Sequence, residues 1–153
     1  MRTLIIFFIA FILIITACDD STTNNNSNSK QISATVNGNK FTASSILIAE
    51  EFGTHLKKLK ILGISGTDSI IVLLCFEPFD SIKTGTYSIT KDGYFLGIYN
   101  HSGISDTATE GTVKVDKFVA ENPIKASGTF NFKIKYNETV LYTISNGIFN
   151  SGD

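Results

Sequence analysis

The stretch ISATVNGNKFTA at residues 32–43 gives the clearest indication of the fold. Apolar and polar residues alternate on both sides of Asn37-Gly38, as is typical of strands that are buried on one face. An Asn-Gly pair between two such runs favours a type I′ turn, because both central residues of that turn take positive φ. A two-residue turn sets Ala34 opposite Phe41, so the apolar side chains fall on one face. The sequence therefore predicts a β-hairpin that packs on a core.

Alternation of this kind continues through the rest of the chain. Further strands are expected at residues 45–51, 59–65, 70–76, 85–89, 94–99, 111–119, 125–136 and 140–149. Turn residues separate these segments at the short spacings that are typical of antiparallel sandwiches and barrels. The sequence therefore predicts a single all-β domain over residues 31–150. We expect about nine strands, arranged as an antiparallel β-sandwich or as a closed or partly open barrel.

Two of these segments allow more specific expectations. Residues 44–60 also fit an amphipathic helix capped by Ser44 or Ser45, although Gly53 within the pattern favours strands. The run IIVLLCF at residues 70–76 is apolar at every position. Such a run indicates a central strand that is buried on both faces.

The connections in the second half of the domain are expected to be polar. Residues 100–109 form its longest polar stretch and indicate an exposed loop. A three-residue turn at residues 137–139 would set Ile134 opposite Tyr142 and keep apolar side chains together. A two-residue turn would pair lysines with apolar residues, so we expect the three-residue turn.

The N-terminus begins with an apolar run, LIIFFIAFILII, at residues 4–15. A membrane-spanning helix needs about 20 apolar residues, so this run is too short to span and has the length of a signal-peptide core. The small residues Thr16 and Ala17 then lead directly to Cys18. An uncleaved membrane anchor and an ordinary cleaved signal remain the alternatives at this point.

The segment Ile15-Thr16-Ala17-Cys18 resembles the lipobox of bacterial lipoproteins. The resemblance implies that residues 1–17 are removed as a signal peptide, that the Cys18 thiol is diacylated and that the new amino group receives a third chain. Each buried methylene contributes about 0.8 kcal/mol, so two or three acyl chains hold a protein in a membrane almost permanently. We therefore expect the protein to bind the membrane through the acyl chains on Cys18.

Residues 18–30 are expected to join this anchor to the domain as a flexible linker. The run DDSTTNNNSNS at residues 19–29 is polar and of low complexity, so it cannot bury enough apolar surface to offset the entropy of ordering. Asp19-Asp20 promotes surface display in some bacteria, whereas in others an Asp beside the cysteine retains the protein at the inner membrane. We expect the protein to be anchored in the outer membrane of a bacterial envelope. The sequence does not distinguish the periplasmic face of this membrane from its outer face.

The charge balance argues against one class of partner. Lys+Arg 13 and Asp+Glu 14 give a formal net charge of −1, and signal removal would also remove Arg2. A nucleic-acid-binding domain would show a basic stripe, so no nucleic-acid partner is expected. Cys75 lies within an apolar run and is interpreted as a small buried hydrophobe rather than a reactive thiol.

The sequence shows no motif for catalysis, a metal or a cofactor. It lacks the spacings of a zinc site, a phosphate-binding loop and a nucleophile elbow. His55 and His101 lie in polar segments and are interpreted as exposed loop residues. We therefore expect no enzymatic activity, no metal and no cofactor.

Four Asp-Ser or Asp-Thr pairs resemble the acceptor motif at which some bacteria O-glycosylate exported proteins. The acceptor residues would be Ser21, Ser69, Ser81 and Thr107. All four fall in the linker or in expected turns, where an enzyme could reach them. The alternative is that these pairs serve only local hydrogen bonding in turns.

The order of several motifs resembles a family of small bacterial envelope lipoproteins that carry an all-β domain of unknown function. These motifs are ATVNGNKFTA, GTYSI, EGTVKVDKF, SGTFNFKI and NGIF, which span most of residues 31–149. The resemblance implies an all-β lipoprotein and no particular activity. We expect a non-catalytic module that binds another envelope protein or a glycan, chiefly through residues 100–109. The alternative is a lipocalin-like carrier of a small apolar ligand.

Overall fold

The computed structural model describes residues 29–52, 57–76, 82–120 and 122–152. These residues form the strands β1 (Gln31–Val36), β2 (Asn39–Thr42), β3 (Ser45–Phe52), β4 (Lys57–Ser65), β5 (Asp68–Phe76), β6 (Gly85–Thr90), β7 (Phe95–His101), β8 (Ile104–Thr107), β9 (Glu110–Val119), β10 (Lys125–Tyr136) and β11 (Thr139–Asn150). The all-β class predicted from the sequence is confirmed. The described part of the chain has no helix that could cross a membrane.

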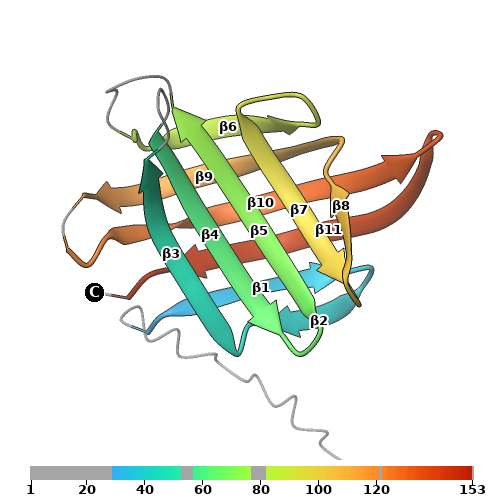
Figure 1. The fold of residues 1–153 in the computed structure, drawn as a ribbon, viewed down its shortest axis with the longest axis horizontal. Helices are drawn as coiled ribbons and strands as arrows, with labels where there is room; N and C mark the ends of the chain where they lie inside the picture. The colour runs from blue at the N-terminus through green and yellow to red at the C-terminus, as the bar shows by residue number, and fades with distance from the viewer. Residues whose placement is uncertain (1–28, 53–56, 77–81, 121, 153) are drawn as a thin grey trace, which may run out of the picture.

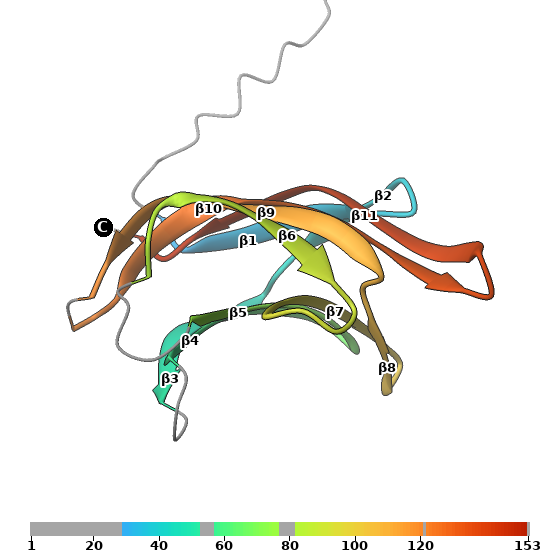
Figure 2. The ribbon, with the colours of Figure 1, turned by 90° about the horizontal axis from the view of Figure 1, so that it is seen from above.

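The strands form two antiparallel sheets that pack face to face (Figure 1). One sheet has six strands in the order β2-β1-β11-β10-β9-β6, and the other has five in the order β3-β4-β5-β7-β8. Seen from above, the sheets are two separate layers that cover each other (Figure 2). The fold is therefore a β-sandwich, and the barrel alternative is wrong.

The β1–β2 hairpin has the register predicted from its Asn-Gly turn. Ala34 lies opposite Phe41, and both are buried. The turn residues Asn37 and Gly38 have φ values of 47° and 84°, as a type I′ turn requires. The Asn-Gly turn and the apolar pattern both favour the same register, which explains why the sequence was sufficient to predict this hairpin.

The β10–β11 hairpin has a different turn from the one expected. Tyr136 pairs with Thr139, so the turn has two residues, Asn137 and Glu138, both with positive φ. A register shift after Ile134 then restores the predicted partnership of Ile134 with Tyr142. The three-residue turn is wrong because a β-bulge, rather than the turn, takes up the extra residue.

Aromatic side chains fill the layer between the sheets. Phe130, Phe132 and Phe149 are at most 2% exposed. The backbone of β7 approaches one of these rings so closely that a Cβ at Gly97 would lie 2.7 Å from Phe132 Cδ1. The interior therefore has the tight packing that is usual for protein cores.

The strands expected within residues 44–60 are confirmed and the helix alternative is wrong, because β3 and β4 pair with each other along their length. Two other sequence expectations are wrong in part. Residues 100–109 contain the edge strand β8, which follows a tight turn at Ser102 and Gly103, rather than one long loop. Strand β5 is central, as predicted, but its outward residues Ile71 and Leu73 are only half-buried because no further layer among the described residues covers them.

Candidate functional site

Aliphatic side chains line the outer surface of the five-stranded sheet. Leu47, Leu62, Ile71 and Ile98 lie opposite one another across β3, β4, β5 and β7, and Leu73 lies opposite Leu96 in the next row. On β5 these residues alternate with core residues, so they project away from the sandwich interior. We call this surface the outer apolar face, composed of Leu47, Leu62, Ile71, Leu73, Leu96 and Ile98.

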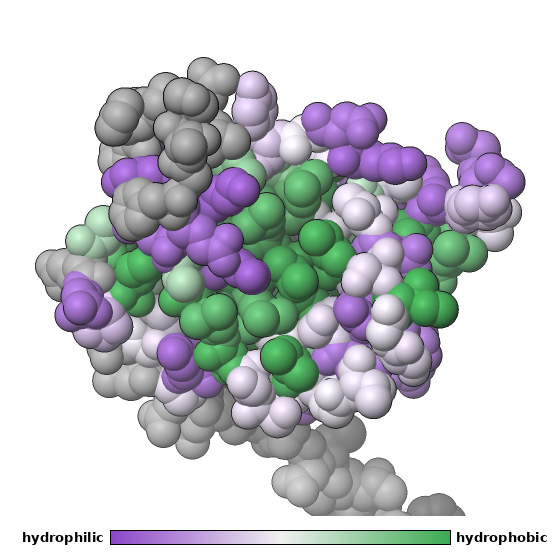
Figure 3. All heavy atoms as spheres, in the orientation of Figure 1, coloured by the Kyte–Doolittle hydropathy of each residue, from purple (hydrophilic) through white to green (hydrophobic). Residues whose placement is uncertain are grey.

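The outer apolar face is continuous and open to solvent. Figure 3 shows apolar side chains gathered at its centre, with polar residues around them. Leu47 is 46% exposed, and the other members are half-buried. The edge strands β3 and β8 bend away from the six-stranded sheet, so this face is concave across its strands (Figure 2). Contiguous exposed apolar surface of this kind usually marks a site of interaction.

Charged residues border one end of the outer apolar face. Lys60 forms an ion pair with Glu51 on β3, with 3.2 Å between Nζ and Oε1. Lys58 lies opposite Glu51 in the β3–β4 ladder. Among the described residues, Lys58 and Lys60 against Glu51 leave one excess positive charge at this end of the face.

A second cluster lies at the other end of the five-stranded sheet, around Asp68. Tyr99 donates its hydroxyl hydrogen to Asp68 Oδ2 at 2.9 Å, and His101 Nδ1 lies 2.9 Å from Asp68 Oδ1. An ionised carboxylate only accepts hydrogen bonds, so the proton of His101 belongs on Nδ1 in this contact. The Nε2 atom of His101 is then left for other partners.

The contacts of this cluster shift two pKa values. Partial burial acts to raise the pKa of Asp68, but the hydrogen bonds from Tyr99 and His101 outweigh it and leave this pKa below its ordinary value. Burial, together with the hydrogen bond to Asp68 and its negative charge, raises the pKa of Tyr99 to about 12. The cluster is therefore an ionised carboxylate held by a neutral phenol and an imidazole.

A pocket of about 260 Å³ opens beside this cluster, between the ends of the two sheets. We call it the interlayer pocket. It is lined by Val36, Asn37, Asn39, Lys40, Phe41, Asp68, Tyr99, His101 and Tyr142. The Asn37 amide already bonds the backbone of Leu141 and Thr143, so its role is structural.

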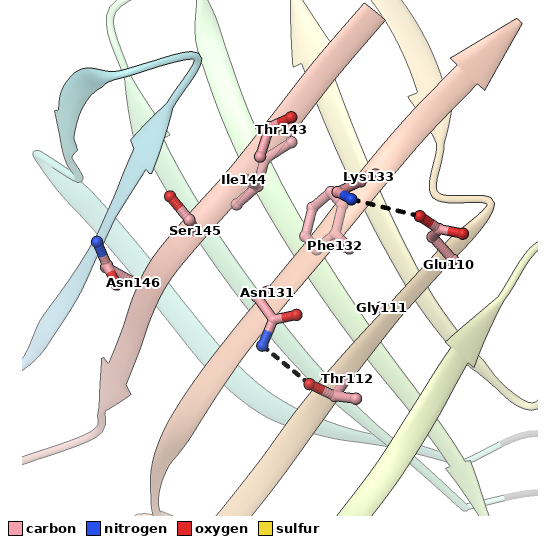
Figure 4. A pocket seen from close by; sticks show the side chains of 10 residues that line it. All are labelled: Glu110, Gly111, Thr112, Asn131, Phe132, Lys133, Thr143, Ile144, Ser145 and Asn146. Atoms are coloured by element: carbon pink, nitrogen blue, oxygen red, sulfur yellow. Dashed lines mark hydrogen bonds and ion pairs between the residues drawn. The ribbon is translucent and has the colours of Figure 1, made fainter. Parts of the chain in front are cut away.

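A larger, polar hollow of about 570 Å³ lies on the outer surface of the six-stranded sheet (Figure 4). It sits at an irregularity where Ser145 and Asn146 of β11 lie beside Asn131 of β10, and Asn146 has a φ of 51°. Within it, the Asn131 side-chain amide donates to Thr112 Oγ1 at 2.9 Å. Lys133 also pairs with Glu110 in this hollow, with 3.7 Å between Nζ and Oε1.

The residues singled out from the sequence fall in different places. Cys18, Ser21, His55 and Ser81 lie outside the described residues. Ser69 lies in β5 and Thr107 in β8, so the expectation that these two occupy turns is wrong, while their glycosylation stays a prediction.

Cys75 is a buried free cysteine, as predicted. Burial raises the pKa of its thiol. A smaller fraction of Cys75 is therefore present as the reactive thiolate than for an exposed cysteine at the same pH.

His101 was interpreted as a loop residue, but it ends β7 and contacts Asp68. Sequence reasoning missed this pair because the two residues are 33 positions apart. The described residues hold no group of three or more His, Cys, Asp and Glu side chains arranged for a metal ion.

Comparison of the chain with protein-family models, curated proteins and solved structures finds no match.

Proposed function

We propose that the chain is a lipid-anchored, non-catalytic binding module of the bacterial cell envelope, and that its outer apolar face binds an amphipathic helix of a partner protein. The observation that supports the binding role is the continuous aliphatic surface across β3, β4, β5 and β7. A sheet face of this composition gains free energy when another element covers it. The lipobox resemblance at Cys18 supports the anchoring role.

The dimensions and chemistry of the outer apolar face favour a helix as its occupant. Four strands about 4.8 Å apart make a surface about 14 Å wide, which matches an α-helix about 10–12 Å in diameter. The six members of the face offer no hydrogen-bonding side chain. A helix satisfies its own backbone groups, whereas an extended segment laid on this surface would leave backbone groups without partners.

The size of the face disfavours a second copy of the chain as the occupant. Six side chains in two rows are few beside the roughly 20–30 residues that each partner contributes to a stable interface. The concave shape also suits a convex partner better than another concave sheet. The lysines at one end of the face suggest that the helix carries acidic residues at the matching end.

The anchor and the face support each other in this proposal. A flexible linker at residues 18–30 would hold the domain close to the membrane while leaving its orientation free. Confinement near a membrane-bound partner raises the effective concentration of both proteins, so a small face is enough for association. The filled interior around Phe130 and Phe132 favours this surface-binding role over an interior ligand carrier.

The anchoring part of the proposal is tested by Cys18→Ala. We expect unprocessed precursor to accumulate and the acylated form to disappear, as measured by intact mass and membrane fractionation. If the variant is processed and fractionates like the wild-type protein, Cys18 is not the lipidated residue.

The binding part is tested by Leu47→Lys combined with Ile98→Lys, with Thr112→Lys in the polar hollow as the matched control. We expect the wild type and the control to migrate in a complex larger than the monomer on native gels of gently solubilised cells. The double variant should migrate as a monomer while keeping its far-UV circular dichroism spectrum. Equal migration of all three proteins would refute the proposed face.

A further inference from the structure

The interlayer pocket is separate from the outer apolar face and has a different chemistry. Lys40 brings a positive charge to it, and Asp68 brings a negative charge. Asp68 Oδ1 accepts hydrogen bonds from His101 and Thr67, whereas Oδ2 accepts one from Tyr99 and keeps a further lone pair for a ligand. His101 Nε2 adds an acceptor when the ring is neutral and a donor when it is protonated.

Aromatic rings supply the apolar part of the pocket. Tyr142 packs edge-on against Tyr99, with 4.9 Å between ring centroids, and His101 stacks on Tyr99 with 6.1 Å between ring centroids. Phe41 forms part of the wall and is buried. An apolar wall with a few convergent polar groups is the usual composition of a small-molecule site.

These groups together specify the class of ligand. An anion would meet the Asp68 carboxylate, and a cation would meet the Lys40 ammonium group. Hydroxyl groups both donate and accept, so a neutral polyhydroxylated ligand can bond to both charged groups without repulsion. We infer that the interlayer pocket binds one neutral sugar ring, with its C–H surface against the aromatic wall and its hydroxyls on Asp68, His101 and Lys40.

The size of the pocket agrees with a single ring. Its volume of about 260 Å³ lies just below the range of roughly 300–1,000 Å³ for sites of drug-sized ligands. For so few ligand atoms, we expect a dissociation constant in about the millimolar range. The domain would then recognise a glycan end through this pocket and a protein through the outer apolar face.

The test uses the whole protein as it is purified from membranes in detergent micelles and titrates it with glucose, galactose, mannose or N-acetylglucosamine. Saturation-transfer NMR measures the binding of each sugar. We expect at least one of these neutral sugars to bind. His101→Ala and Lys40→Ala each remove a polar side chain that contacts the sugar, so each should raise the dissociation constant about tenfold. The matched control is Asn131→Ala in the polar hollow, which should leave binding unchanged.

Several outcomes would overturn the inference. These are binding of none of the four sugars, loss of binding in Asn131→Ala but not in His101→Ala, and tighter binding of the anion glucuronate or the cation glucosamine than of every neutral sugar. Thermal unfolding of each variant, followed by circular dichroism, shows whether lost binding reflects lost folding. Lys40 is exposed at the surface, so its variant keeps the test valid if His101→Ala unfolds.

Discussion

At the scale of single residues, the contact between Tyr99 and Asp68 has a measurable electrostatic signature. The carboxylate accepts the phenolic hydrogen and disfavours ionisation of the ring, as burial does. The neutral phenol is thus favoured in the folded protein. The contribution of Tyr99 to stability is complete below the ordinary pKa of 10.0 and is lost as pH rises toward about 12.

We predict that an alkaline titration, monitored by ultraviolet absorbance, shows one tyrosine that ionises near pH 12. Tyr99→Phe should remove that step. Asp68→Asn should move it to lower pH, because the carboxylate charge is gone while burial remains. If the step persists unchanged in Tyr99→Phe, the tyrosine with the raised pKa has been misidentified.

The acid side of the same contact gives a second prediction. The pKa of Asp68 is lowered in the folded protein, so its contribution to stability is present above the ordinary value of 3.8 and is lost as pH falls through the lower folded value. The difference in unfolding free energy between wild type and Asp68→Asn should therefore shrink on acidification below that point. Urea unfolding at a series of pH values measures it, and a difference that stays constant would contradict the linkage.

Residue-scale properties were predictable only where they depend on local sequence. The burial of Cys75 followed from the apolar run around it. The Asp68–Tyr99–His101 cluster did not, because its partners lie 31 and 33 positions from Asp68 and meet only when β5 pairs with β7. A polar residue at the start of one strand and a histidine at the end of another have no local pattern that links them.

At the scale of elements, strand β7 depends on a glycine where it crosses the core. Gly97 has no side chain, and Phe132 fills the space that a Cβ would need. We predict that Gly97→Ala lowers the free energy of unfolding by about 1–3 kcal/mol, as overpacking of a core usually does. Urea unfolding measures the change.

The control for this prediction is Ser88→Ala on the exposed side of β6. It should change the unfolding free energy by less than about 0.5 kcal/mol, because it alters no buried contact. Equal stability of Gly97→Ala and Ser88→Ala would show that the β7 backbone and Phe132 are not in close contact.

Element boundaries were predictable to the extent that turn chemistry was explicit. The Asn-Gly turn at residues 37–38 identified its hairpin and its register. The turn at Asn137 and Glu138 was missed because glutamate at positive φ is uncommon, and because the bulge beyond Ile134 hides the true turn length. Strand β8 was missed because its composition is that of a loop.

At the scale of the whole molecule, the two outer surfaces of the sandwich differ. The six-stranded sheet presents the polar hollow, whereas the five-stranded sheet presents the outer apolar face. Alternation in the sequence shows which side chains share a face, but it does not show whether another layer covers that face. This is why residues 70–76 were expected to be buried on both sides, and why the candidate interface emerged only from the structure.

The central claim is that the outer apolar face binds a helix, and photo-crosslinking in intact cells tests it most directly. A photo-reactive amino acid replaces Ile71 at the centre of the face, or Thr112 on the opposite sheet as the control. We predict an adduct at position 71 but not at 112. Its crosslinked peptide, sequenced by mass spectrometry, should come from another protein and carry apolar residues at the i, i+3, i+4 and i+7 spacing of an amphipathic helix. Adducts at position 71 only with lipid or with a second copy of the chain, or no adduct there, would contradict the claim.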